Sequence, residues 1–322
     1  MVASDASGRI AVRLEGGIGD HLLGMRILGF VRQRFPHREI VVYSDANGGE
    51  AQLAVARLSP DADRVVAVRL RAPPPTTEVM GRLENLDPDA LAEIRGADLF
   101  LDTWGPGFFL ATSCRLAVPV YEILAARPRL AVPPAARRDA DLLLARWPEA
   151  RFLVVNLNKL GPDWLDAALG LLHPMLEELL ADPRVVVLAP VSTRFPFAHW
   201  PAAERASRED AAAAELDRVR ALADWHERVA ILPDLPIAVV AALLRRASYF
   251  IGVDNGIKHL AWALGVPRTV LMSKIPKALF ALRWCPDLHR VLPLAAADTD
   301  MLASHLAEAK AALATESRSR VT

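Results

Sequence analysis

The sequence has little of several features that define whole classes of protein. Only two cysteines, Cys114 and Cys285, occur among 322 residues, which excludes a disulfide framework and a four-thiolate metal site. This cysteine usage fits a reduced, cytoplasmic environment. The N-terminus lacks the basic and apolar segments of a signal peptide, and no apolar run reaches the roughly 18 residues of a membrane-spanning helix. We therefore expect a globular, cytoplasmic protein.

The chain also lacks net charge. Lys and Arg together number 38, as do Asp and Glu, so no overall field attracts nucleic acid, and we predict no nucleic-acid partner. Only five of the basic residues are lysines, which makes the position of each lysine informative. Hydrophobic residues make up 52% of the chain, enough to bury large cores.

Strand-like and helix-like segments alternate, a pattern that predicts parallel sheets covered by helices. We interpret the fold as α/β, with two Rossmann-like doubly wound domains facing a cleft. The predicted boundaries are residues 1–127 for an N-terminal domain, 128–150 for a proline- and arginine-rich linker, 151–296 for a C-terminal domain, and 297–322 for a helix and tail.

The individual elements follow from runs of apolar residues and from turn signals. Strands are expected over Arg9–Leu14, Glu39–Ser44, Arg64–Leu70, Asp98–Asp102, Phe152–Leu157, Arg184–Ala189, Val229–Leu232, Ser248–Val253 and Thr269–Met272. Helices are expected over about 20–34, 111–126, 139–146, 164–180, 208–226, 236–247, 255–264 and 297–314. Ligands of such folds bind at the carboxyl ends of strands, so the loops there are the places to inspect.

The loop after the first strand reads Glu-Gly-Gly-Ile-Gly-Asp. Gly16, Gly17 and Gly19 would let a substrate approach the backbone at a helix start. A dinucleotide fingerprint is excluded because Leu22 stands where a third glycine is needed, and the Gly-Lys-Ser/Thr of a phosphate-binding P-loop is missing. Asp20 is either a helix cap or a carboxylate that takes a proton from an acceptor hydroxyl.

Other polar residues follow strands of the N-terminal half. Asp45, Asn47, Asp102 and Trp104 are candidates for binding an acceptor sugar, with Trp104 as a stacking face. Loop capping and core packing are the alternative roles for these side chains.

A second motif, Gly-Val-Asp-Asn-Gly-Ile-Lys-His, spans residues 252–259 between a buried strand and a helix. Asp254, Asn255 and Gly256 would place side chains and backbone N–H groups at the helix start, a geometry that binds anions. Lys258 and His259 come one turn later. The alternative is a capped helix with ordinary surface charge.

The rare lysines fall near this motif in the predicted topology. A cluster of cations on strand-end loops favours a diphosphate ligand. The lysines concerned are Lys159, Lys258, Lys274 and Lys277. Further candidates for the same ligand are Asn158 beside Lys159, and Ser192 and Thr193 after the next strand.

Two segments carry a resemblance to a known family. Residues 231–274, which include the Asp-Asn-Gly-x-x-His turn, and residues 16–36 resemble the donor-binding and N-terminal segments of glycosyltransferase family 9, the ADP-heptose heptosyltransferases. The resemblance implies a GT-B fold, with the acceptor in the N-terminal domain and a nucleotide-sugar in the C-terminal domain. It implies that Asp20 is the catalytic base, that Gly256 and His259 bind the diphosphate, and that Leu235 lies near the nucleotide base.

The resemblance also implies the chemistry. We expect a metal-independent, inverting transfer of heptose or a related sugar, with no cofactor beyond the nucleotide-sugar co-substrate, an ADP-sugar. Four Asp-x-Asp pairs could suggest a metal site, but each is better explained as a turn or helix start. The pairs are Asp61/Asp63, Asp87/Asp89, Asp139/Asp141 and Asp298/Asp300.

Alternatives remain open at this stage. A fucosyltransferase-like enzyme would use a GDP-sugar. A catalytically silent nucleotide-sugar-binding protein is motivated by Pro162, which stands where the family often has a lysine. A sugar-nucleotide epimerase would need no acceptor. The acceptor is a saccharide or another small molecule. A lipopolysaccharide core would bring the enzyme to the inner membrane face as a peripheral contact, although no basic amphipathic helix is evident.

Overall fold

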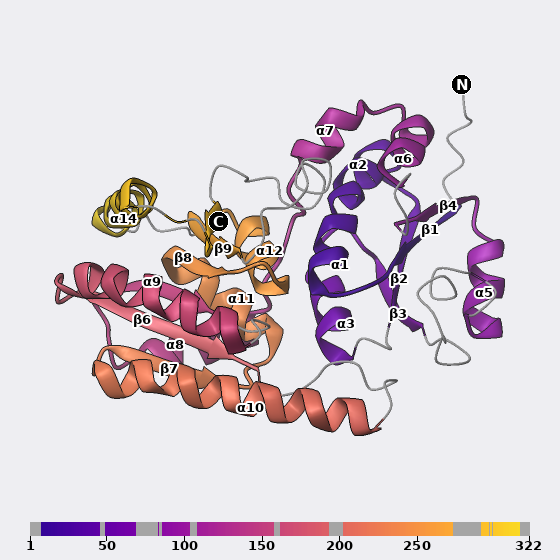
Figure 1. Cartoon of the computed structure of the whole chain (residues 1–322). Helices are drawn as coiled ribbons and strands as arrows, with labels where there is room; N and C mark the ends of the chain where they lie inside the picture. Colours follow the sequence, from indigo (N-terminus) through magenta and orange to yellow (C-terminus); the bar gives the residue numbers. More distant parts are fainter. Residues whose placement is uncertain are drawn as a thin grey trace. The chain divides into compact units, whose positions relative to one another are not determined.

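The structure is a computed structural model that describes residues 8–45, 49–68, 83, 86–103, 108–157, 162–192, 202–272, 291–295, 297 and 299–315. It divides into two compact units, one made of residues up to Ala131 together with residues 196–202, and the other made of residues 132–195 and 203–322. Each unit is an α/β domain with its own parallel sheet and its own helices (Figure 1). We describe the N-terminal and C-terminal units separately.

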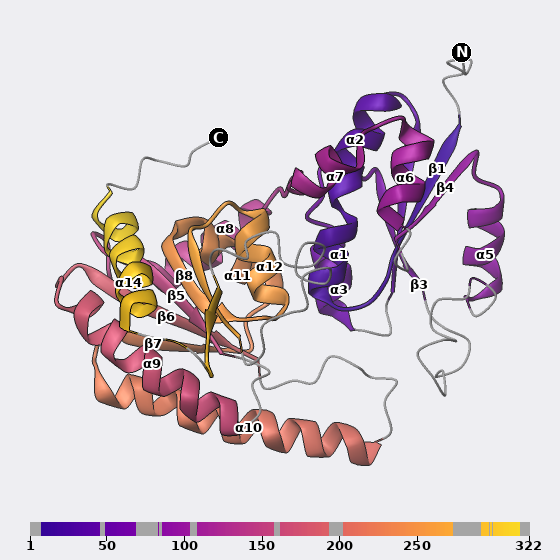
Figure 2. The same ribbon diagram turned by 45° about the horizontal axis from the view of Figure 1, so that its top comes forward.

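The sheet of the N-terminal unit has the strand order β3-β2-β1-β4, and all its neighbouring strands are parallel. The strands are β1 (Arg9–Leu14), β2 (Glu39–Asp45), β3 (Arg64–Val68) and β4 (Leu99–Asp102). The helices are α1 (Ile18–Gly24), α2 (Arg26–Arg34), α3 (Glu50–Ala56), α5 (Pro88–Arg95), α6 (Phe108–Leu116) and α7 (Val120–Ala125). Helices α1 and α3 cover one face of this sheet and α5 the other (Figures 1 and 2).

The sheet of the C-terminal unit has the strand order β10-β9-β8-β5-β6-β7, again all parallel. The strands are β5 (Arg151–Asn156), β6 (Val185–Val191), β7 (Val229–Pro233), β8 (Ala247–Val253), β9 (Arg268–Met272) and β10 (Val291–Pro293). The helices are α8 (Pro134–Leu144), α9 (Pro162–Leu180), α10 (Ala202–Trp225), α11 (Ile237–Arg246), α12 (Gly256–Ala263) and α14 (Thr299–Ala314).

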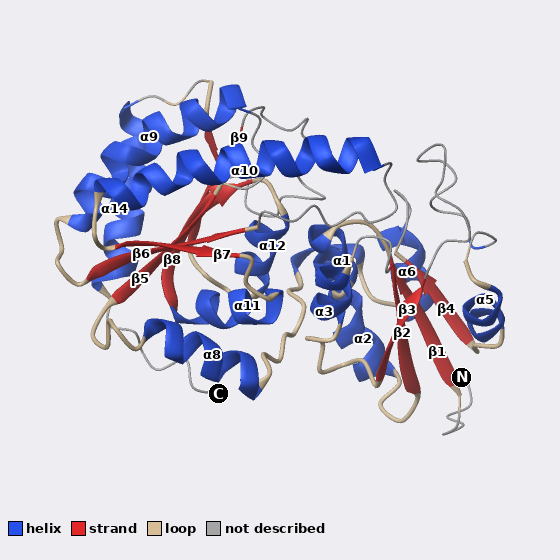
Figure 3. Ribbon diagram, turned by 90° about the horizontal axis from the view of Figure 1, so that it is seen from below, coloured by secondary structure: helices blue, strands red, loops and turns tan. Residues whose placement is uncertain are grey.

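A large core cluster lies on one face of the C-terminal sheet. Leucines of α9, such as Leu172 and Leu176, pack there with Leu216 of α10 and Leu313 of α14 against side chains of the strands. Helices α8, α11 and α12 cover the opposite face (Figures 2 and 3). Burial on both faces explains why strands such as β6 are continuous apolar runs without alternation.

All nine predicted strands are present, so the α/β prediction is confirmed for both halves. Two long helices were predicted wrongly. The helix expected over 20–34 is broken at Met25, whose carbonyl accepts from Leu28 N–H in a tighter i→i+3 turn. The helix expected over 111–126 is two helices, because Pro119 has no N–H to continue the first and instead precedes α7.

Other differences concern element ends and short elements. Helix α8 begins at Pro134, before the predicted residue 139, because proline is well suited to the first turn of a helix. Helix α10 begins at Ala202 rather than at residue 208. The short helices α3 and α5 and the three-residue strand β10 were not predicted from the sequence.

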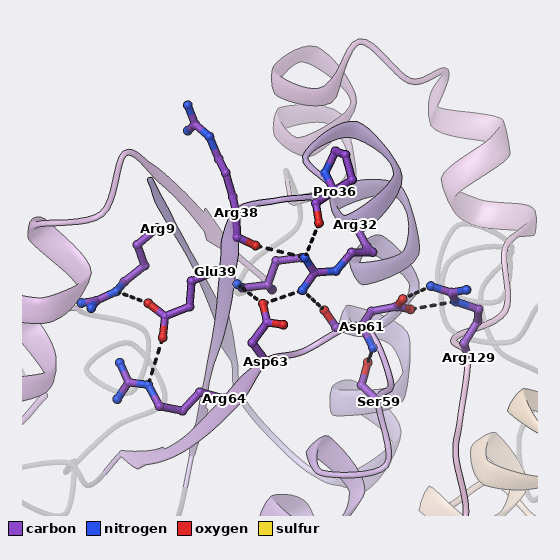
Figure 4. Close-up of polar contacts among 11 residues, drawn as sticks. Arg9, Arg32, Pro36, Arg38, Glu39, Ser59, Asp61, Asp63, Arg64 and Arg129 are labelled. Atoms are coloured by element: carbon purple, nitrogen blue, oxygen red, sulfur yellow. Dashed lines mark hydrogen bonds and ion pairs between the residues drawn. The ribbon is translucent and has the colours of Figure 1, made fainter. Parts of the chain in front are cut away.

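At the amino end of the N-terminal sheet, charged side chains tie the strand starts together (Figure 4). The Arg32 guanidinium donates to the carbonyls of Pro36, Arg38 and Asp61 and lies 2.5 Å from the Asp63 carboxylate. Asp63 also accepts from the Ile40 N–H at 2.7 Å, which helps hold the pKa of this carboxyl below its usual value. Asp61 and Asp63 are therefore structural residues within a turn.

Asp61 also anchors the end of the N-terminal unit. Its side chain is 2% exposed and forms a two-pronged ion pair with Arg129, with Nε 3.0 Å from Oδ2. Two residues later, Ala131 N–H donates to the Leu58 carbonyl. The segment that leads out of this unit is thus held to it by one buried carboxylate and one backbone hydrogen bond.

The remaining Asp-x-Asp pairs differ from one another. Asp87 is the N-cap of α5 and accepts from Ala90 N–H at 2.9 Å, which confirms the predicted helix start. Asp139 and Asp141 lie inside α8, so the helix start predicted there is wrong. Asp300 lies in the first turn of α14, and Asp298 is outside the described residues.

The Asp61–Arg129 pair gives a stability prediction. We expect Asp61→Asn to lower the free energy of unfolding by about 1–3 kcal/mol, because a buried ionic hydrogen bond is weakened and its geometry lost. The matched control is Asp141→Asn, which removes an exposed ion pair with Arg246 and should change stability by less than about 1 kcal/mol. Urea denaturation measures both, and equal effects would contradict the anchoring role of Asp61.

Candidate functional site

The strand order locates one candidate site in each unit. In the N-terminal sheet the chain runs from β1 outward to β2 and β3, and then places β4 on the other side of β1. The order therefore reverses between β1 and β4. In doubly wound sheets the crevice outside the carboxyl ends of the strands at such a switch point is where ligands bind. The loop after β1 and the end of β4 lie at this point.

The loop after β1 is held in a tight conformation by Asp20. Gly16 has a φ of +90°, which disfavours other residues, and a Cβ at this position would meet Asp20 Oδ2 at 2.6 Å. Asp20 lies in the first turn of α1, where Oδ2 accepts from Gly17 N–H at 2.8 Å. The carboxylate thus has a capping role, as one of the two predictions had it, while remaining partly exposed at the switch point.

His21 fixes the same loop from the inside of the unit. Its imidazole is fully buried, with Nδ1 3.1 Å from the Gly17 carbonyl oxygen and Nε2 2.9 Å from Ser44 Oγ near the end of β2. Burial lowers the pKa of His21 to about 4, so the ring is neutral at pH 7. A carbonyl can only accept, so Nδ1 carries the proton and Nε2 accepts from the Ser44 hydroxyl. Sequence reasoning missed His21, which directly follows Asp20.

Asp102, a predicted acceptor-binding residue, is engaged within the unit. It ends β4 opposite Arg13 of β1, and the Arg13 guanidinium binds both of its oxygens, at 3.0 and 2.7 Å. Glu15, which is also buried, lies 3.4 Å from the same guanidinium. The Asp102 side chain keeps 31% of its exposure. Any ligand would therefore meet a carboxylate whose position is set by Arg13.

The C-terminal sheet has its own switch point. The chain runs from β5 outward to β6 and β7, and then crosses to β8 on the other side of β5. The order reverses between β5 and β8, whose last residues are Asn156 and Val253. The predicted motif Asp254–His259 follows β8 directly, so the structure places it at this switch point. Gly252 is needed here because a Cβ would come within 2.7 Å of the Asn156 carbonyl oxygen.

The two basic residues of this motif, Lys258 and His259, lie beside Asp254. Lys258 is 3% exposed, and its Nζ lies 2.5 Å from Asp254 Oδ1. His259 Nε2 lies 4.0 Å from the same oxygen. The Asp254 side chain is 45% exposed. Lys258, predicted from the sequence to face a diphosphate, is thus buried and paired with a carboxylate.

Asn255 caps helix α12 and links it to the sheet. Its Oδ1 accepts from the N–H groups of Ile257 and Lys258 at 2.9 and 3.2 Å. Its Nδ2 donates to Asn156 Oδ1 at 2.7 Å, and Asn156 Nδ2 donates to the Pro190 carbonyl at 2.6 Å. Sequence reasoning missed Asn156. A polar residue ending the apolar run Phe-Leu-Val-Val was the available signal.

Ser192 and Leu235 lie at the carboxyl ends of the adjacent strands β6 and β7. Val191 pairs with Pro233, and Asp234 N–H donates to the Val191 carbonyl at 2.8 Å, so the turn after β7 is fixed to the end of β6. Ser192 is exposed and Leu235 is partly buried. Both predicted residues thus lie at the carboxyl edge that holds Asn156 and Asp254.

Several predicted residues lie outside the described part of the chain. They are Asn47, Trp104, Asn158, Lys159, Thr193, Lys274 and Lys277. For Asp45 only the backbone is described, as the last residue of β2. Cys114 is an exposed free thiol, and Cys285 lies outside the described residues. Within the described ranges, no three His, Cys, Asp or Glu side chains gather as a metal site. No helix described there is long and apolar enough to span a membrane.

Known proteins share this architecture. The family model of glycosyltransferase family 9 (heptosyltransferase) matches residues 173–274, about a third of the chain, including the motif after β8 but not the loop after β1. No curated protein matches the chain in sequence.

Among solved structures, a family 9 glycosyl transferase from Veillonella parvula aligns with a TM-score of 0.59 at 14% identity, covering 91% of this chain and 86% of that one. ADP-heptose lps heptosyltransferase II of E. coli aligns with a TM-score of 0.56 at 15% identity, covering 95% and 98%. E. coli heptosyltransferase WaaC with ADP aligns with a TM-score of 0.52 at 17% identity, covering 95% and 99%.

The two doubly wound units and these structural likenesses define the fold class of the chain, the GT-B fold with two Rossmann-like domains. Within that class, the family-model match confirms the predicted resemblance to glycosyltransferase family 9, the heptosyltransferases.

The buried imidazole predicts a pH dependence of stability. The pKa of His21 is about 4 in the folded state against 6.5 when exposed, so the unfolded chain binds the proton more tightly. The contribution of the neutral His21 to the free energy of unfolding is complete above pH 6.5. It falls by about 1.4 kcal/mol for each pH unit between pH 6.5 and pH 4, which is a loss of about 3 kcal/mol in all.

The comparison of wild type with His21→Gln isolates this effect, because all other titrating groups are common to both proteins. We expect the difference in unfolding free energy, measured in urea between pH 7.5 and 4.5, to shrink as the pH falls. Parallel stability curves would contradict the buried, neutral state of His21.

Proposed function

We propose that the protein is a metal-independent, inverting glycosyltransferase that moves heptose or a related sugar from a nucleoside-diphosphate donor to an acceptor hydroxyl. One observation carries the proposal. The loop with Asp20 and the motif Asp254–His259 lie at the topological switch points of their own sheets, where doubly wound folds bind ligands. The acceptor belongs to the N-terminal unit and the donor to the C-terminal unit.

Donor binding is assigned to the start of α12 and the neighbouring strand ends. Helix N-termini attract anions through free N–H groups and the positive end of the helix dipole. Asn255 Oδ1 accepts from two of these N–H groups, those of Ile257 and Lys258. The N–H of Gly256 does not donate to Asn255, and we assign it to the diphosphate. His259 is the second group assigned to the diphosphate. Ser192 and Leu235 are assigned to the ribose and base side of the donor.

Asp20 is assigned as the catalytic base. Its Oδ2 is occupied by Gly17 N–H, a contact that orients the carboxylate rather than neutralising it. The carboxylate takes the proton of the acceptor hydroxyl, whose oxygen forms a bond to the anomeric carbon of the sugar. The bond from that carbon to the diphosphate oxygen breaks, and the nucleoside diphosphate leaves with the electron pair. A single displacement of this kind inverts the anomeric configuration.

The leaving charge is stabilised by groups fixed before the reaction. Backbone N–H groups at a helix start require no reorganisation when charge develops, which is the usual source of electrostatic catalysis. The proposal of metal independence rests on this assignment of protein groups to the diphosphate. A chelator provides the direct test, because an enzyme that uses the helix start alone keeps its activity in EDTA.

Asp20→Asn tests the base. The amide oxygen can still accept from Gly17 N–H, so the loop keeps its hydrogen bond while the proton acceptor is lost. We expect ADP release from an ADP-sugar, with water or a panel of polyols and sugars as acceptor, to fall about 10²–10⁴-fold. Affinity for the nucleotide should stay unchanged.

The matched control is Asp87→Asn, which alters the N-cap of α5, a helix to which no part of the proposed site is assigned. It should lower stability by about 1 kcal/mol or less and leave turnover per folded molecule unchanged. Turnover in Asp20→Asn equal to that of the wild type would show that Asp20 is not the catalytic base. If wild type and Asp20→Asn both bind nucleotide and neither turns over, the alternative of a catalytically silent nucleotide-sugar-binding protein is favoured.

Calorimetry with ADP, GDP, UDP and dTDP tests the donor site. We expect selective ADP binding that weakens about tenfold or more when Lys258 and His259 are both replaced by alanine, a loss of about 1.4 kcal/mol or more. Lys310→Ala is the control, because Lys310 is an exposed lysine of the same unit paired with Glu178. GDP selectivity would support the fucosyltransferase-like alternative. Equal binding by all three proteins would contradict the assigned diphosphate site.

A further inference from the structure

We propose that Asn156 is a positioning residue of the donor site, acting through Asn255 on the start of helix α12. The inference rests on the proposed function of that helix start. Three consecutive links join the helix to two strands. Asn255 Oδ1 accepts from the helix amides, Asn255 Nδ2 donates to Asn156 Oδ1 at 2.7 Å, and Asn156 Nδ2 donates to the Pro190 carbonyl at 2.6 Å. We call this chain of contacts the amide ladder.

The ladder has only one consistent arrangement of its amide groups. The Pro190 carbonyl can only accept, so Asn156 must point its NH₂ group toward β6 and its oxygen toward Asn255. Asn255 must then point its NH₂ group toward Asn156, which leaves its oxygen for the N–H groups of Ile257 and Lys258. The carbonyl of β6 therefore determines the orientation of the cap of α12.

Burial makes this arrangement rigid. Asn156 is 3% exposed and Asn255 is 8% exposed, so water cannot readily replace a lost link. An unpaired amide in such a place is costly, which favours the fully bonded state over alternatives. The start of α12 is thereby tied at once to β5 and β6, the strands on one side of the switch point, while β8 leads into the helix from the other side.

This placement bears on the donor because a diphosphate held by backbone N–H groups is sensitive to small displacements of the helix start. The Asp254–Lys258 pair cannot fix the helix start alone, since Asp254 is 45% exposed and lies outside the sheet. The side chain of Asn156 is not assigned a contact with the ligand. Its role is to hold the side chain of Asn255, the N-cap of α12, so that the N–H of Gly256 stays in a fixed position.

The test separates the ladder from the cap. Asn156→Leu keeps the number and branching of the side-chain heavy atoms and removes the links to Asn255 and Pro190. Asn255→Ser retains a good N-cap but its short side chain cannot reach Asn156. The matched control is Thr269→Val on neighbouring β9, which removes an equally buried hydroxyl bonded to Tyr249 and His305. All three variants break buried hydrogen bonds in the same unit.

Three measurements are made on each protein: the affinities for ADP and for adenosine by calorimetry, the melting temperature, and amide hydrogen exchange at Ile257 and Lys258. We expect Asn156→Leu and Asn255→Ser to weaken ADP binding about tenfold, with adenosine affinity unchanged. Exchange at the two amides should speed up in Asn156→Leu. Thr269→Val should lower the melting temperature and leave ADP affinity and exchange at these amides as in wild type.

Each outcome decides the proposal. The proposal is overturned if Asn156→Leu binds ADP with the same affinity as Thr269→Val. It is also overturned if Asn156→Leu loses ADP and adenosine binding in parallel, because that result indicates a general structural role. If Asn156→Leu does not fold, Asn255→Ser gives the same comparison. A wild type that binds no nucleotide refutes the proposed function, and with it the positioning of a donor. Hydrogen exchange then still shows whether Asn156 holds the start of α12.

Discussion

Both candidate sites depend on one constraint, the reversal of strand order next to the first strand of each sheet. In each unit the first strand, β1 or β5, is central, and the chain must cross it to add the next strand on the other side. In doubly wound sheets the crevice at such a reversal lies outside the carboxyl ends of the two flanking strands. The glycine-rich loop follows β1 and the Asp-Asn-Gly motif follows β8, and each of these strands flanks the reversal of its own sheet.

At both switch points, buried polar groups hold the loops through side-chain contacts that cross between strands. His21 joins the loop after β1 to Ser44 of β2, and Arg13 joins β1 to Asp102 of β4. In the C-terminal unit the amide ladder joins α12 to β5 and β6. The loop at the switch point is therefore held by different groups in the two units, an imidazole and a guanidinium in the N-terminal unit and two side-chain amides in the C-terminal unit.

The sequence was most informative where local signals are strong. Continuous apolar runs predicted every strand from β1 to β9, and glycine-rich turns predicted the two loops at the switch points. Helix breaks at Met25 and Pro119 were missed because the apolar pattern continues across them. His21 and Asn156 were missed for a different reason. Their partners, Ser44 and Pro190, lie 23 and 34 residues away, and only the parallel pairing of strands brings them into contact.

Lys258 has a partner that the sequence did not reveal. Its rarity and its position one turn into α12 suggested a cation that faces a diphosphate. In the structure its ammonium group is 3% exposed and bound to Asp254, so the pair contributes little net charge to an incoming anion. In the proposed donor site the groups assigned to the diphosphate are then the N–H of Gly256 and His259, and their effect depends on their position rather than on net charge. A site of this kind needs a helix start that does not move, and the buried contacts of Asn255 and Asn156 supply that constraint.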